Sequence, residues 1–580
     1  MISLRSCSKA LFLGSLVPLL LAHQTAAALL VVNTLDDELN NDGDCSLREA
    51  VQSRNTNLTI DQCGAGQIFD PSEIFIDLNG VIELDSPLEI LQQVMIYGRG
   101  FNATTLSGQD SNRHFRLGIA GASQDFELRD ITLANGHEAG DGGSILISQA
   151  DNVIIDRVRF LSNQTVGGDT SGGAIGTRLA NDNNTRLAIT NSLFASNISS
   201  ENGGAIAVRV SPSFGPPDSL VIQESSFSNN TAQGTRGGAV HSADVPIVVI
   251  EDSLFRNNSA GSVGGALWLG SSGASFTYNQ LRNTTFLDNE SGGIGGAIQT
   301  TNGTTVIRNS TFSGNEASNG AALHAGADAE TAIFHSTFID NGRASTSNGS
   351  VLRASVNAEI SLSHSIVFSF DAAMDSECGD TGGGSSFVSL GHNIDASGSC
   401  TGHPSDIPMT DPQLAPLDDY GDDTNFLLLR TFLPLNGPAK DGGQNGPCPG
   451  GAGATLLDDQ RGRSRPTSAG ANRCDIGAVE VQSGSDPTGF PFAVSINRGS
   501  GTVISSPGGI DCPGDCVGQF LEDSTVTLTA IPAPGFVLTD WGGECAGKTP
   551  ICQFTITGAG SASAVFDPTS DEIFSDRFEN

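Results

Sequence analysis

A short pattern repeats along the middle of the chain, and it limits the possible folds more than any other feature. In each copy a phenylalanine is followed three residues later by an asparagine, and then by a Gly-Gly-Ala-aliphatic stretch or a degraded form of it. Successive copies are 26 to 34 residues apart, and a period of this size is the signature of a stacked repeat architecture. The phenylalanines are Phe160, Phe194, Phe227, Phe255, Phe286, Phe312 and Phe338, and the asparagines are Asn163, Asn197, Asn230, Asn258, Asn289, Asn315 and Asn341.

Each copy contains two or three short β-type segments, for example TRLAIT, NSLF and GGAIAV, separated by Asn, Gly and Ser. No helical periodicity lies between these segments, which excludes helical solenoids. A unit this short cannot close its own hydrophobic core, so neighbouring units must stack. Parallel stacking of coils about 4.8 Å apart predicts an all-β fold, a right-handed parallel β-helix of the pectate-lyase kind.

Stacking in register places equivalent side chains of successive coils above one another. We therefore expect the phenylalanines to form an inward column of offset rings. The hydroxyl residues two positions earlier should also face inward and form hydrogen bonds along the column. The asparagines are expected at turns, with a left-handed backbone and their amides in a ladder. The hydroxyl residues are Ser192, Ser225, Ser253, Thr284, Ser310 and Ser336.

Four histidines of the repeats could be read as ligands: His241, His324, His335 and His364. His335 and His364 occupy matching repeat positions, and we interpret them as stacked surface residues rather than ligands. The same interpretation covers His241 and His324.

The chain is strongly acidic, with 28 Lys and Arg residues against 64 Asp and Glu residues and a net charge of −36. Such a charge repels nucleic acid and anionic membrane surfaces. Near the N-terminus Arg5 and Lys9 precede the apolar run Leu11–Leu21, and Ala26–Ala28 follow. Residues 1–28 are therefore predicted to be a secretory signal peptide. No later stretch approaches the roughly 20 apolar residues of a membrane helix, so we expect no membrane span.

Removal of the signal peptide leaves ten cysteines, an even number that fits disulfides in an oxidising compartment. Zinc is the competing interpretation, but none of the spacings is a pair of two-residue-spaced cysteines. Proximity in the sequence favours Cys45 with Cys63, Cys378 with Cys400, and Cys448 with Cys474. The pairing of the last four stays open: Cys512, Cys516, Cys545 and Cys552.

The pairing of Phe-x-x-Asn with Gly-Gly-Ala-aliphatic resembles the repeats of the chlamydial polymorphic outer membrane proteins, from Leu133 to about Val367. That resemblance implies a surface-exposed β-helix implicated in adhesion. Members of the family generally continue into a membrane barrel that exports them, whereas fewer than 220 residues follow the repeats here and carry cysteines. We therefore do not expect display by autotransport.

An acidic segment, DDELNNDGDCSLREAVQSRN, follows the strand-like LLVVNTL. Ser46 and Glu49 have the spacing of a capping box, which predicts a short helix to about Arg54. The letters from Cys45 to Ala50 match the CSLREA domain, a segment found at the start of many secreted bacterial β-helix proteins. The resemblance implies that residues 29–65 cap the N-terminal end of the solenoid, whose strand edges would otherwise be unpaired.

The same segment also has the spacing of a calcium loop. Glu38, Asn40, Asp42, Gly43 and Glu49 fall at its positions 1, 3, 5, 6 and 12. A calcium site at Glu38, Asn40, Asp42 and Glu49 is one interpretation, and a solvated acidic loop is the other, because capping already explains Glu49. No other cofactor is expected.

Four segments after residue 410 resemble the choice-of-anchor Q region of right-handed β-helix proteins: DPQLAPLDDYG, LPLNGPAKDGG, DDQRGRSRP and CDIGAVE. Where this chain has Gly437-Pro438-Ala439-Lys440-Asp441, that family usually has Ser-Pro-Ala-Ile/Val-Asp. Its members mostly lack a known activity. We interpret the charged residues of these segments as pairs that pin a C-terminal cap together rather than as a catalytic cleft. They are Asp441, Asp459, Arg461, Arg465, Asp475 and Glu480.

The composition changes after Gly484 through the linker SGSDPTGFP. The rest of the chain resembles the divergent InlB B-repeat family, since it carries the elements G-x-V, D-C-x-x-x-C, V-x-L-x-A-x-P and W-G-G-x-C. Such domains usually serve as spacers or adhesive modules, and we interpret Trp541 as the core of a small all-β domain rather than as a sugar platform. The end, DEIFSDRFEN, resembles short tails of secreted gammaproteobacterial proteins.

The expected organisation follows from these segments. It is a signal peptide (1–28), an N-terminal cap (29–65), β-helix repeats (66–410), a C-terminal cap (411–482), a linker (483–491), a small β domain (492–568) and a tail (569–580).

No residue is assigned a catalytic role. Inverting hydrolysis needs two carboxylates about 6.5 to 9.5 Å apart, and a lyase needs an acidic calcium cluster with a base. No such set recurs at a common repeat position, and Gly391-His392-Asn393, the nearest fragment to the Gly-His-Gly motif of polygalacturonases, lies beyond the regular coils.

We therefore expect a secreted or outer-surface protein of a Gram-negative bacterium that acts without catalysis, in adhesion or by binding an extracellular glycan or host matrix. A polysaccharide lyase or glycoside hydrolase of the β-helix class is the alternative. The oligomeric state is left open.

Overall fold

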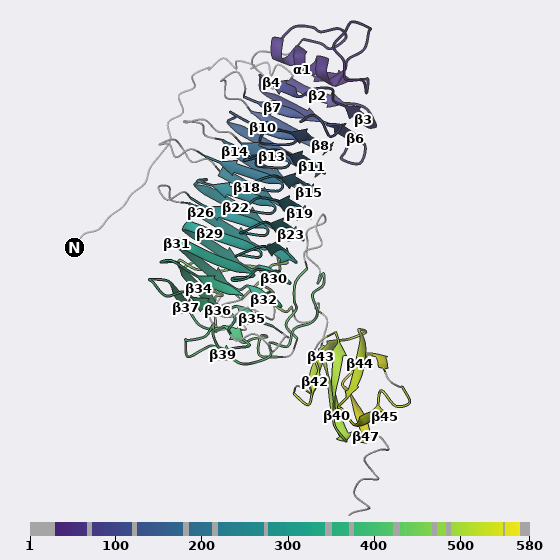
Figure 1. Ribbon diagram of the computed structural model, residues 1–580, viewed down its shortest axis with the longest axis vertical. Helices are drawn as coiled ribbons and strands as arrows, with labels where there is room; N and C mark the ends of the chain where they lie inside the picture. Colours follow the sequence, from purple (N-terminus) through teal and green to yellow (C-terminus); the bar gives the residue numbers. More distant parts are fainter. Residues whose placement is uncertain are drawn as a thin grey trace, which may run out of the picture.

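The structure, a computed structural model, is a long parallel β-helix followed by a small β domain (Figure 1). It describes residues 29–65, 72–118, 125–177, 185–210, 219–271, 277–342, 351–369, 376–420, 430–435, 437–466, 473–482, 486, 489–507, 509–514, 516–548 and 551–568. The predicted signal peptide and C-terminal tail lie outside these residues. The fold class predicted from the repeat is confirmed.

Successive coils pair strand on strand in four parallel ladders. The register is that of the repeat, since Phe194 pairs with Phe160 in the preceding coil and with Phe227 in the next. A long strand sometimes turns a corner and serves two ladders, as β11 does by pairing with both β14 and β15.

The strands of the ladders have the following bounds. The first ladder is β1 (Leu29–Val32), β2 (Ser72–Ile76), β5 (Val94–Tyr97), β8 (Phe126–Ala134), β11 (Asn152–Leu161), β14 (Arg186–Thr190), β18 (Ser219–Gln223), β22 (Ile247–Glu251), β26 (Tyr278–Arg282), β29 (Ile298–Arg308), β31 (Leu323–Phe334), β34 (Glu359–Ser363) and β37 (Ser386–Ser389). The second is β3 (Gly80–Glu83), β6 (Thr104–Ser107), parts of β8 and β11, β15 (Leu193–Ala195), β19 (Ser226–Ser228), β23 (Leu254–Arg256), β27 (Thr285–Leu287), β30 (Thr311–Ser313), β32 (Thr337–Ile339), β35 (Ile366–Phe368), β38 (Ile394–Asp395) and β39 (Ile407–Pro408). The third is β9 (His137–Glu138), β12 (Gln164–Thr165), β16 (Ile198–Ser199), β20 (Thr231–Ala232), β24 (Ser259–Ala260) and β28 (Glu290–Ser291). The fourth is β4 (Leu88–Ile90), β7 (Phe115–Leu117), β10 (Ile145–Ile147), β13 (Ile175–Thr177), β17 (Ile206–Arg209), β21 (Val240–Ala243), β25 (Leu267–Gly270), parts of β29 and β31, β33 (Leu352–Ala354) and β36 (Cys378–Asp380).

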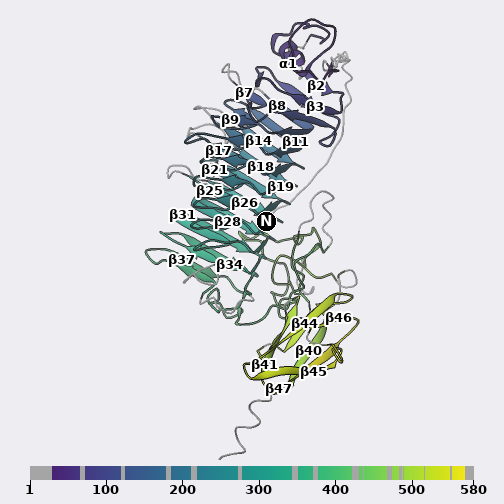
Figure 2. The ribbon, with the colours of Figure 1, turned by 45° about the vertical axis from the view of Figure 1, so that its right-hand side comes forward.

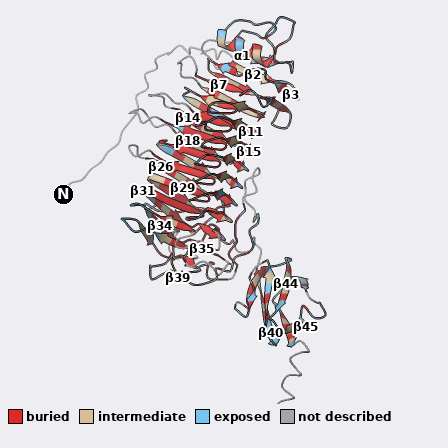
Figure 3. Cartoon of the chain, viewed as in Figure 1, coloured by how far each residue is buried: buried red, intermediate tan, exposed pale blue. Residues whose placement is uncertain are grey.

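The repeated phenylalanines form the predicted inward column. From Phe160 to Phe338, consecutive ring centroids lie 4.5–5.1 Å apart and the rings are tilted by at most 13°. Every ring of the column is fully buried. Burying one such side chain stabilises the fold by roughly 1.5–3 kcal/mol, and the column therefore joins the coils into one hydrophobic core, visible as buried strands in Figure 3.

The repeated asparagines form a buried ladder. Nδ2 of Asn197 donates to Oδ1 of Asn230 at 2.9 Å and to the carbonyl oxygen of Phe160 at 3.0 Å. The other members repeat this arrangement up to Asn341, which donates to the Phe312 and Ile339 carbonyls instead. All seven asparagine side chains are fully buried. The prediction of a left-handed backbone at these asparagines was wrong by one residue, because the positive φ angles belong to the residue before, such as Ser196 (56°) and Asn229 (55°).

The inward hydroxyl groups also link the coils as predicted. Oγ of Ser225 accepts a hydrogen bond from the backbone N–H of Ser192, one coil earlier, and donates to the carbonyl oxygen of Gln223. The same pattern recurs at Ser253 and Ser336. Buried N–H groups at this corner are thereby satisfied by side chains.

The repeated glycine pairs lie where neighbouring coils approach most closely. Gly203 has a φ of 63°, and a Cβ at Gly204 would stand 2.1 Å from the carbonyl oxygen of Gly238 in the next coil. A residue with a Cβ does not fit there, so the position requires glycine.

The N-terminal end is covered by helix α1 (Leu47–Thr56). Its N-cap Ser46 and residue Glu49 form the predicted capping box. Arg54, at the last turn of the helix, donates to the carbonyl oxygen of Gln93 between two early strands, so the helix is fastened to the first coils.

Residues 411–482, here called the lateral segment, extend along the side of the last coils (Figure 2). Three threonines at equivalent positions of the second ladder form hydrogen bonds with this segment. Thr285 donates to the Arg430 carbonyl at 3.1 Å, Thr311 lies 3.0 Å from Thr431, and Thr337 accepts from the Ala478 N–H at 3.0 Å. An ion pair between Arg282 and Asp458 adds to this contact.

The C-terminal domain consists of two four-stranded sheets, in the orders β43-β40-β47-β45 and β42-β41-β44-β46. Trp541 is 1% exposed and belongs to its core, as expected from the sequence. Leu521 packs against Leu435 and Val479 of the lateral segment. The strands are β40 (Gly489–Arg498), β41 (Gly501–Ser506), β42 (Asp511–Cys512), β43 (Val517–Leu521), β44 (Thr525–Pro532), β45 (Phe536–Gly543), β46 (Ile551–Thr555) and β47 (Gly560–Pro568).

Candidate functional site

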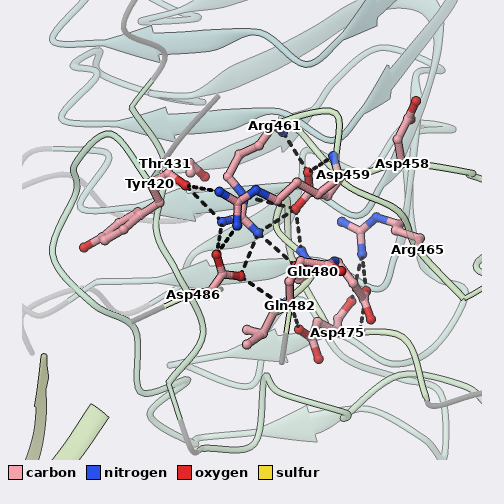
Figure 4. A network of polar contacts seen from close by, with 12 residues as sticks. Tyr420, Thr431, Asp458, Asp459, Arg461, Arg465, Asp475, Glu480, Gln482 and Asp486 are labelled. Carbon is pink, nitrogen blue, oxygen red and sulfur yellow. Dashed lines mark hydrogen bonds and ion pairs between the residues drawn. The ribbon is translucent and has the colours of Figure 1, made fainter. Parts of the chain in front are cut away.

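Charged residues of the lateral segment form a buried, paired network together with Asp486, which follows the segment (Figure 4). Arg461 contacts the carboxylate of Asp459 at 2.9 Å and that of Asp486 at 2.8 Å. Arg465 contacts Glu480, also at 2.9 Å. The side chains of Arg461 and both of its carboxylate partners are at most 1% exposed. Such a set fixes one conformation of the segment and leaves little surface for a substrate.

The acids of this network are further held by backbone N–H groups. Asp475 accepts from the N–H groups of Asp441 and Val481, each at 2.6 Å, and Glu480 accepts from the Asp475 N–H at 2.9 Å. Burial raises the pKa of Glu480 to about 7 and that of Asp475 to about 6. Asp441 itself is exposed and enters the network through its backbone alone among the described contacts.

The residues of the expected calcium loop lie close together at the N-terminal end. Asn40 donates its amide to both Glu38 and Asp42. Glu49 accepts from the N–H groups of Asn40 and Ser46, so both of its oxygens serve the backbone. Carboxylate oxygens of Glu38, Asp42 and Asp44 lie within 4.8 Å of one another. Burial raises the pKa of Glu38 and of Asp44, and their acidic neighbours add to the effect. Calcium binding here stays a prediction.

A cavity of about 480 Å³ lies between the last coils and the lateral segment, and we call it the histidine cavity. Its volume is in the range of small-molecule sites. The lining combines apolar surfaces with neutral hydrogen-bonding groups and, among the described residues, includes no Asp, Glu, Lys or Arg. It consists of Phe334, Ser363, His364, Leu390, His392, His403, Gln444, Pro447, Pro449, Gly451, Gly453, Ala454 and Thr455.

The protonation of its three imidazoles follows from their partners. Nε2 of His364 accepts from the Gln444 N–H, so its Nδ1 carries the proton toward Ser363. His392 directs Nδ1 at the Gly442 carbonyl, 3.3 Å away, which leaves Nε2 as an acceptor. Nδ1 of His403 accepts from the Ser405 N–H, which leaves Nε2–H as a donor. Burial lowers the pKa of His364 to about 3 and also lowers that of His392, so both are neutral at pH 7.

The structure corrects the interpretation of four histidines. His335 and His364 are stacked, with ring centroids 4.8 Å apart, but they are buried rather than on the surface. His392 continues the stack, and all three have the left-handed backbone of one repeated corner position. The lateral segment covers this corner, which is why the prediction failed. His241 and His324 are also buried, at 2% and 6% exposure.

A second buried pair of acids lies in the last coil. Glu377 is 1% exposed and Asp395 is fully buried. Oε2 of Glu377 accepts from the N–H groups of Ala396 and Ser397, while Oε1 has no hydrogen bond among the described residues. Burial, and next the charge of Asp395, raise the pKa of Glu377 to about 8. Glu377 is therefore protonated at neutral pH and available to donate to Asp395.

All ten cysteines after the predicted signal peptide are paired. The bonds are Cys45–Cys63, Cys378–Cys400, Cys448–Cys474, Cys512–Cys516 and Cys545–Cys552. The Cys512–Cys516 and Cys545–Cys552 bonds settle the pairing of the last four cysteines, which the sequence left open. Among the described residues, no helix has the length and hydropathy to cross a membrane.

Comparison with known proteins adds two findings. Residues 493–570 match the family model described as the divergent InlB B-repeat domain, which confirms the resemblance at this end of the chain. A solved structure of the PL6 family alginate lyase AlyGC is similar at 12% identity, with a TM-score of 0.35, over 74% of this chain and 60% of that chain. This chain thus spans less than two thirds of the length of AlyGC, and so slight a likeness says nothing of its activity. No curated protein matches the chain.

Proposed function

We propose that this chain is an extracellular β-helix protein that binds an uncharged saccharide in the histidine cavity, without catalysis. One observation carries the proposal. The cavity presents apolar surfaces beside neutral donors and acceptors, with no charged side chain among its described lining residues. Sugars offer apolar C–H faces and hydroxyl groups that both donate and accept, so the lining matches their chemistry.

The imidazoles of His392 and His403 have complementary roles in this proposal. Nε2 of His392 accepts a hydrogen bond from a sugar hydroxyl, and Nε2–H of His403 donates one. Phe334, Leu390 and Pro447 provide apolar contact area. Because both acids of a hydrolase would have to line the same cavity, the described lining favours binding over hydrolysis.

The extracellular location is part of the proposal. Five disulfides fit an oxidising compartment, and the B-repeat match supports a surface protein. We further propose that residues 29–65 are a CSLREA cap, that the lateral segment is a choice-of-anchor Q region, and that the host is a Gram-negative bacterium. The contact of α1 with the first coils supports the N-terminal cap, and the contacts of the three threonines support a segment that docks along the side of the last coils.

A glycan array probed with the purified full chain tests the function. We expect binding to uncharged glycans that withstands high salt, since no ion pairs hold the ligand. Each positive glycan is then incubated with the protein and assayed for new reducing ends and for unsaturated products. Absence of binding would contradict the proposal, and release of new chain ends would replace binding by a polysaccharide-degrading activity.

A further inference from the structure

His241 and Trp268 lie side by side on the outer face of the fourth ladder, in successive coils. The two residues pair in the ladder, and their rings are stacked with centroids 4.7 Å apart. Their strand neighbours Val240 and Leu267 belong to the hydrophobic core, so the alternation of a strand directs His241 and Trp268 away from it. Both rings are nevertheless buried. A polar ring is therefore held outside the core and away from bulk solvent.

The imidazole of His241 has no hydrogen-bonding partner. Neither Nδ1 nor Nε2 forms a hydrogen bond within the described part of the chain. Burial lowers the pKa of His241 to about 3, and the charges of Arg209 and Arg236 lower it further. The ring is therefore neutral and carries one N–H donor. A buried donor without an acceptor is unfavourable, and its retention calls for an explanation such as an ion that binds there.

Two exposed arginines lie beside these rings. Arg236 precedes β21, and its guanidinium carbon lies 5.1 Å from the centroid of the Trp268 ring. Arg209 ends β17, one coil earlier, and its ladder partner Ala243 stands two residues beyond His241. A strand separation of about 4.8 Å and a rise of about 3.3 Å per residue place the Cα atoms of Arg209 and His241 roughly 8 Å apart. An arginine side chain spans that distance.

The two arginines lack acidic partners. Neither Arg209 nor Arg236 forms an ion pair with any described residue, although the chain has 64 Asp and Glu residues against 28 Lys and Arg residues. Arg157, by contrast, contacts the carboxylate of Asp130 at 2.7 Å. The charges that act on the His241 ring are likewise both positive. Two cations and a buried N–H donor thus come together here, and what they have in common is affinity for an anion.

We propose that Arg209, Arg236 and His241 form a binding site for an oxyanion, the carboxylate or sulfate group of a small ligand. Guanidinium groups present forks of N–H donors that match such oxygens in pairs. The unused N–H of His241 supplies a further donor. Trp268 positions the site, because it stacks on the imidazole and attracts the Arg236 guanidinium to its ring. Both arginine side chains are exposed, so they can turn to admit the anion and close over it.

The oxyanion site is separate from the histidine cavity. It lies on β21 and β25, in the middle coils, whereas the cavity lies between the last coils and the lateral segment. Its ligand is also different, since the cavity has no charged side chain among its described lining residues. Acetate and sulfate are not saccharides, so a test with these ions is independent of saccharide binding. Either proposal can fail without the other.

The test follows tryptophan fluorescence of the purified full chain during titration with sodium acetate and with sodium sulfate. Sodium chloride at the same ionic strength is the control for screening. We expect a saturable change with an oxyanion that chloride does not produce. Trp268→Phe should abolish the change, because the only other tryptophan of the sequence, Trp541, lies in the core of the C-terminal domain.

Three variants and a matched control locate the anion. Arg209→Gln and Arg236→Gln should each weaken binding at least about tenfold, the effect of losing a charge-assisted hydrogen bond. His241→Phe keeps a stacked ring but removes the N–H donor, and it should also bind more weakly. Arg256→Gln removes the same charge from an exposed arginine of the second ladder, and it should bind like the wild type.

Far-UV circular dichroism establishes that each variant is folded, and the two exposed arginines can be replaced without disturbing the core. A saturable response to either oxyanion supports the site, and the tighter of the two identifies the group that it prefers. The proposal is overturned if neither oxyanion acts beyond chloride. It is equally overturned if Arg209→Gln and Arg236→Gln respond as the wild type does, or if Arg256→Gln weakens binding as much as they do.

Discussion

Nδ2 of Asn230 donates to Oδ1 of Asn258 in the next coil at 2.9 Å, while its own Oδ1 accepts from Nδ2 of Asn197 at 2.9 Å. Asn230 also donates to the Phe194 carbonyl, and all of these groups are buried. One side chain therefore links three coils. The copies are 26 to 34 residues apart, and each coil nevertheless presents the same amide at the equivalent position.

Removal of this amide should destabilise the solenoid. We expect Asn230→Ala to lower the free energy of unfolding by about 2–4 kcal/mol, because it leaves buried partners in two coils unsatisfied. Asn229→Gly is the matched control, since Asn229 is exposed and its φ of 55° suits glycine. Urea denaturation followed by circular dichroism measures both, and equal stability of the two variants would refute the role of the ladder.

The guanidinium of Arg461 should matter far more than that of an exposed arginine. Arg461→Met removes the ion-pair partner of the buried Asp459 and one of the two partners of Asp486, which keeps Arg463, and the change should cost about 3–5 kcal/mol. Arg99→Met is the control, because Arg99 and its partner Asp77 are about half exposed and such pairs contribute at most about 1 kcal/mol. Thermal unfolding and limited proteolysis of the lateral segment report the difference. A loss below about 1 kcal/mol at Arg461 would show that the network is not structural.

Stability should fall as the pH rises toward 8. The folded-state pKa of Glu377 is raised to about 8 from an ordinary value of 4.5, so the folded chain holds a proton that the unfolded chain has lost. The contribution is complete below pH 4.5 and is lost progressively up to about pH 8. Glu377→Gln keeps a donor toward Asp395 and removes this slope, so the variant should exceed the wild type by about 1 kcal/mol or more at pH 9. Parallel pH profiles for the two proteins would disprove the raised pKa of Glu377.

Calcium should stabilise the N-terminal end if the acidic loop binds it. Glu38, Asp42 and Asp44 place carboxylate oxygens within 4.8 Å of one another, and Oδ1 of Asp44 has no partner among the described residues. Millimolar Ca²⁺ should raise the thermal midpoint of the wild type, and Asp42→Asn should remove most of the increase. Asp77→Asn, on a half-exposed acid outside the loop, should respond like the wild type. An unchanged midpoint with Ca²⁺ would favour the solvated acidic loop.

The β-helix could be predicted from the sequence because the same pattern occurs in every coil. Seven copies of Phe-x-x-Asn each specify the same inward ring and the same amide, so register errors in one coil would be corrected by its neighbours. The capping box at Ser46 and Glu49 was predictable for the opposite reason, since it is a local pattern that needs no distant partner.

The histidine cavity was not predictable, because contacts far apart in the sequence create it. His364 and Gln444 meet only when the lateral segment lies along the coils. One signal of that docking was present in the sequence. The residue before the repeated phenylalanine changes from Leu193, Ser226 and Leu254 in earlier coils to threonine in three later ones, Thr285, Thr311 and Thr337, where the segment binds. The periodic pattern alone gives no reason to notice this change.

The most direct test of the account is the affinity of the full chain for an uncharged glycan identified on the array, measured by titration calorimetry for three proteins. We predict that His403→Ala, which removes an exposed donor of the histidine cavity, binds at least tenfold more weakly than the wild type. His137→Ala, a partly exposed histidine near the other end of the solenoid, should bind unchanged. Equal affinity of all three proteins would place the glycan elsewhere and contradict the central claim.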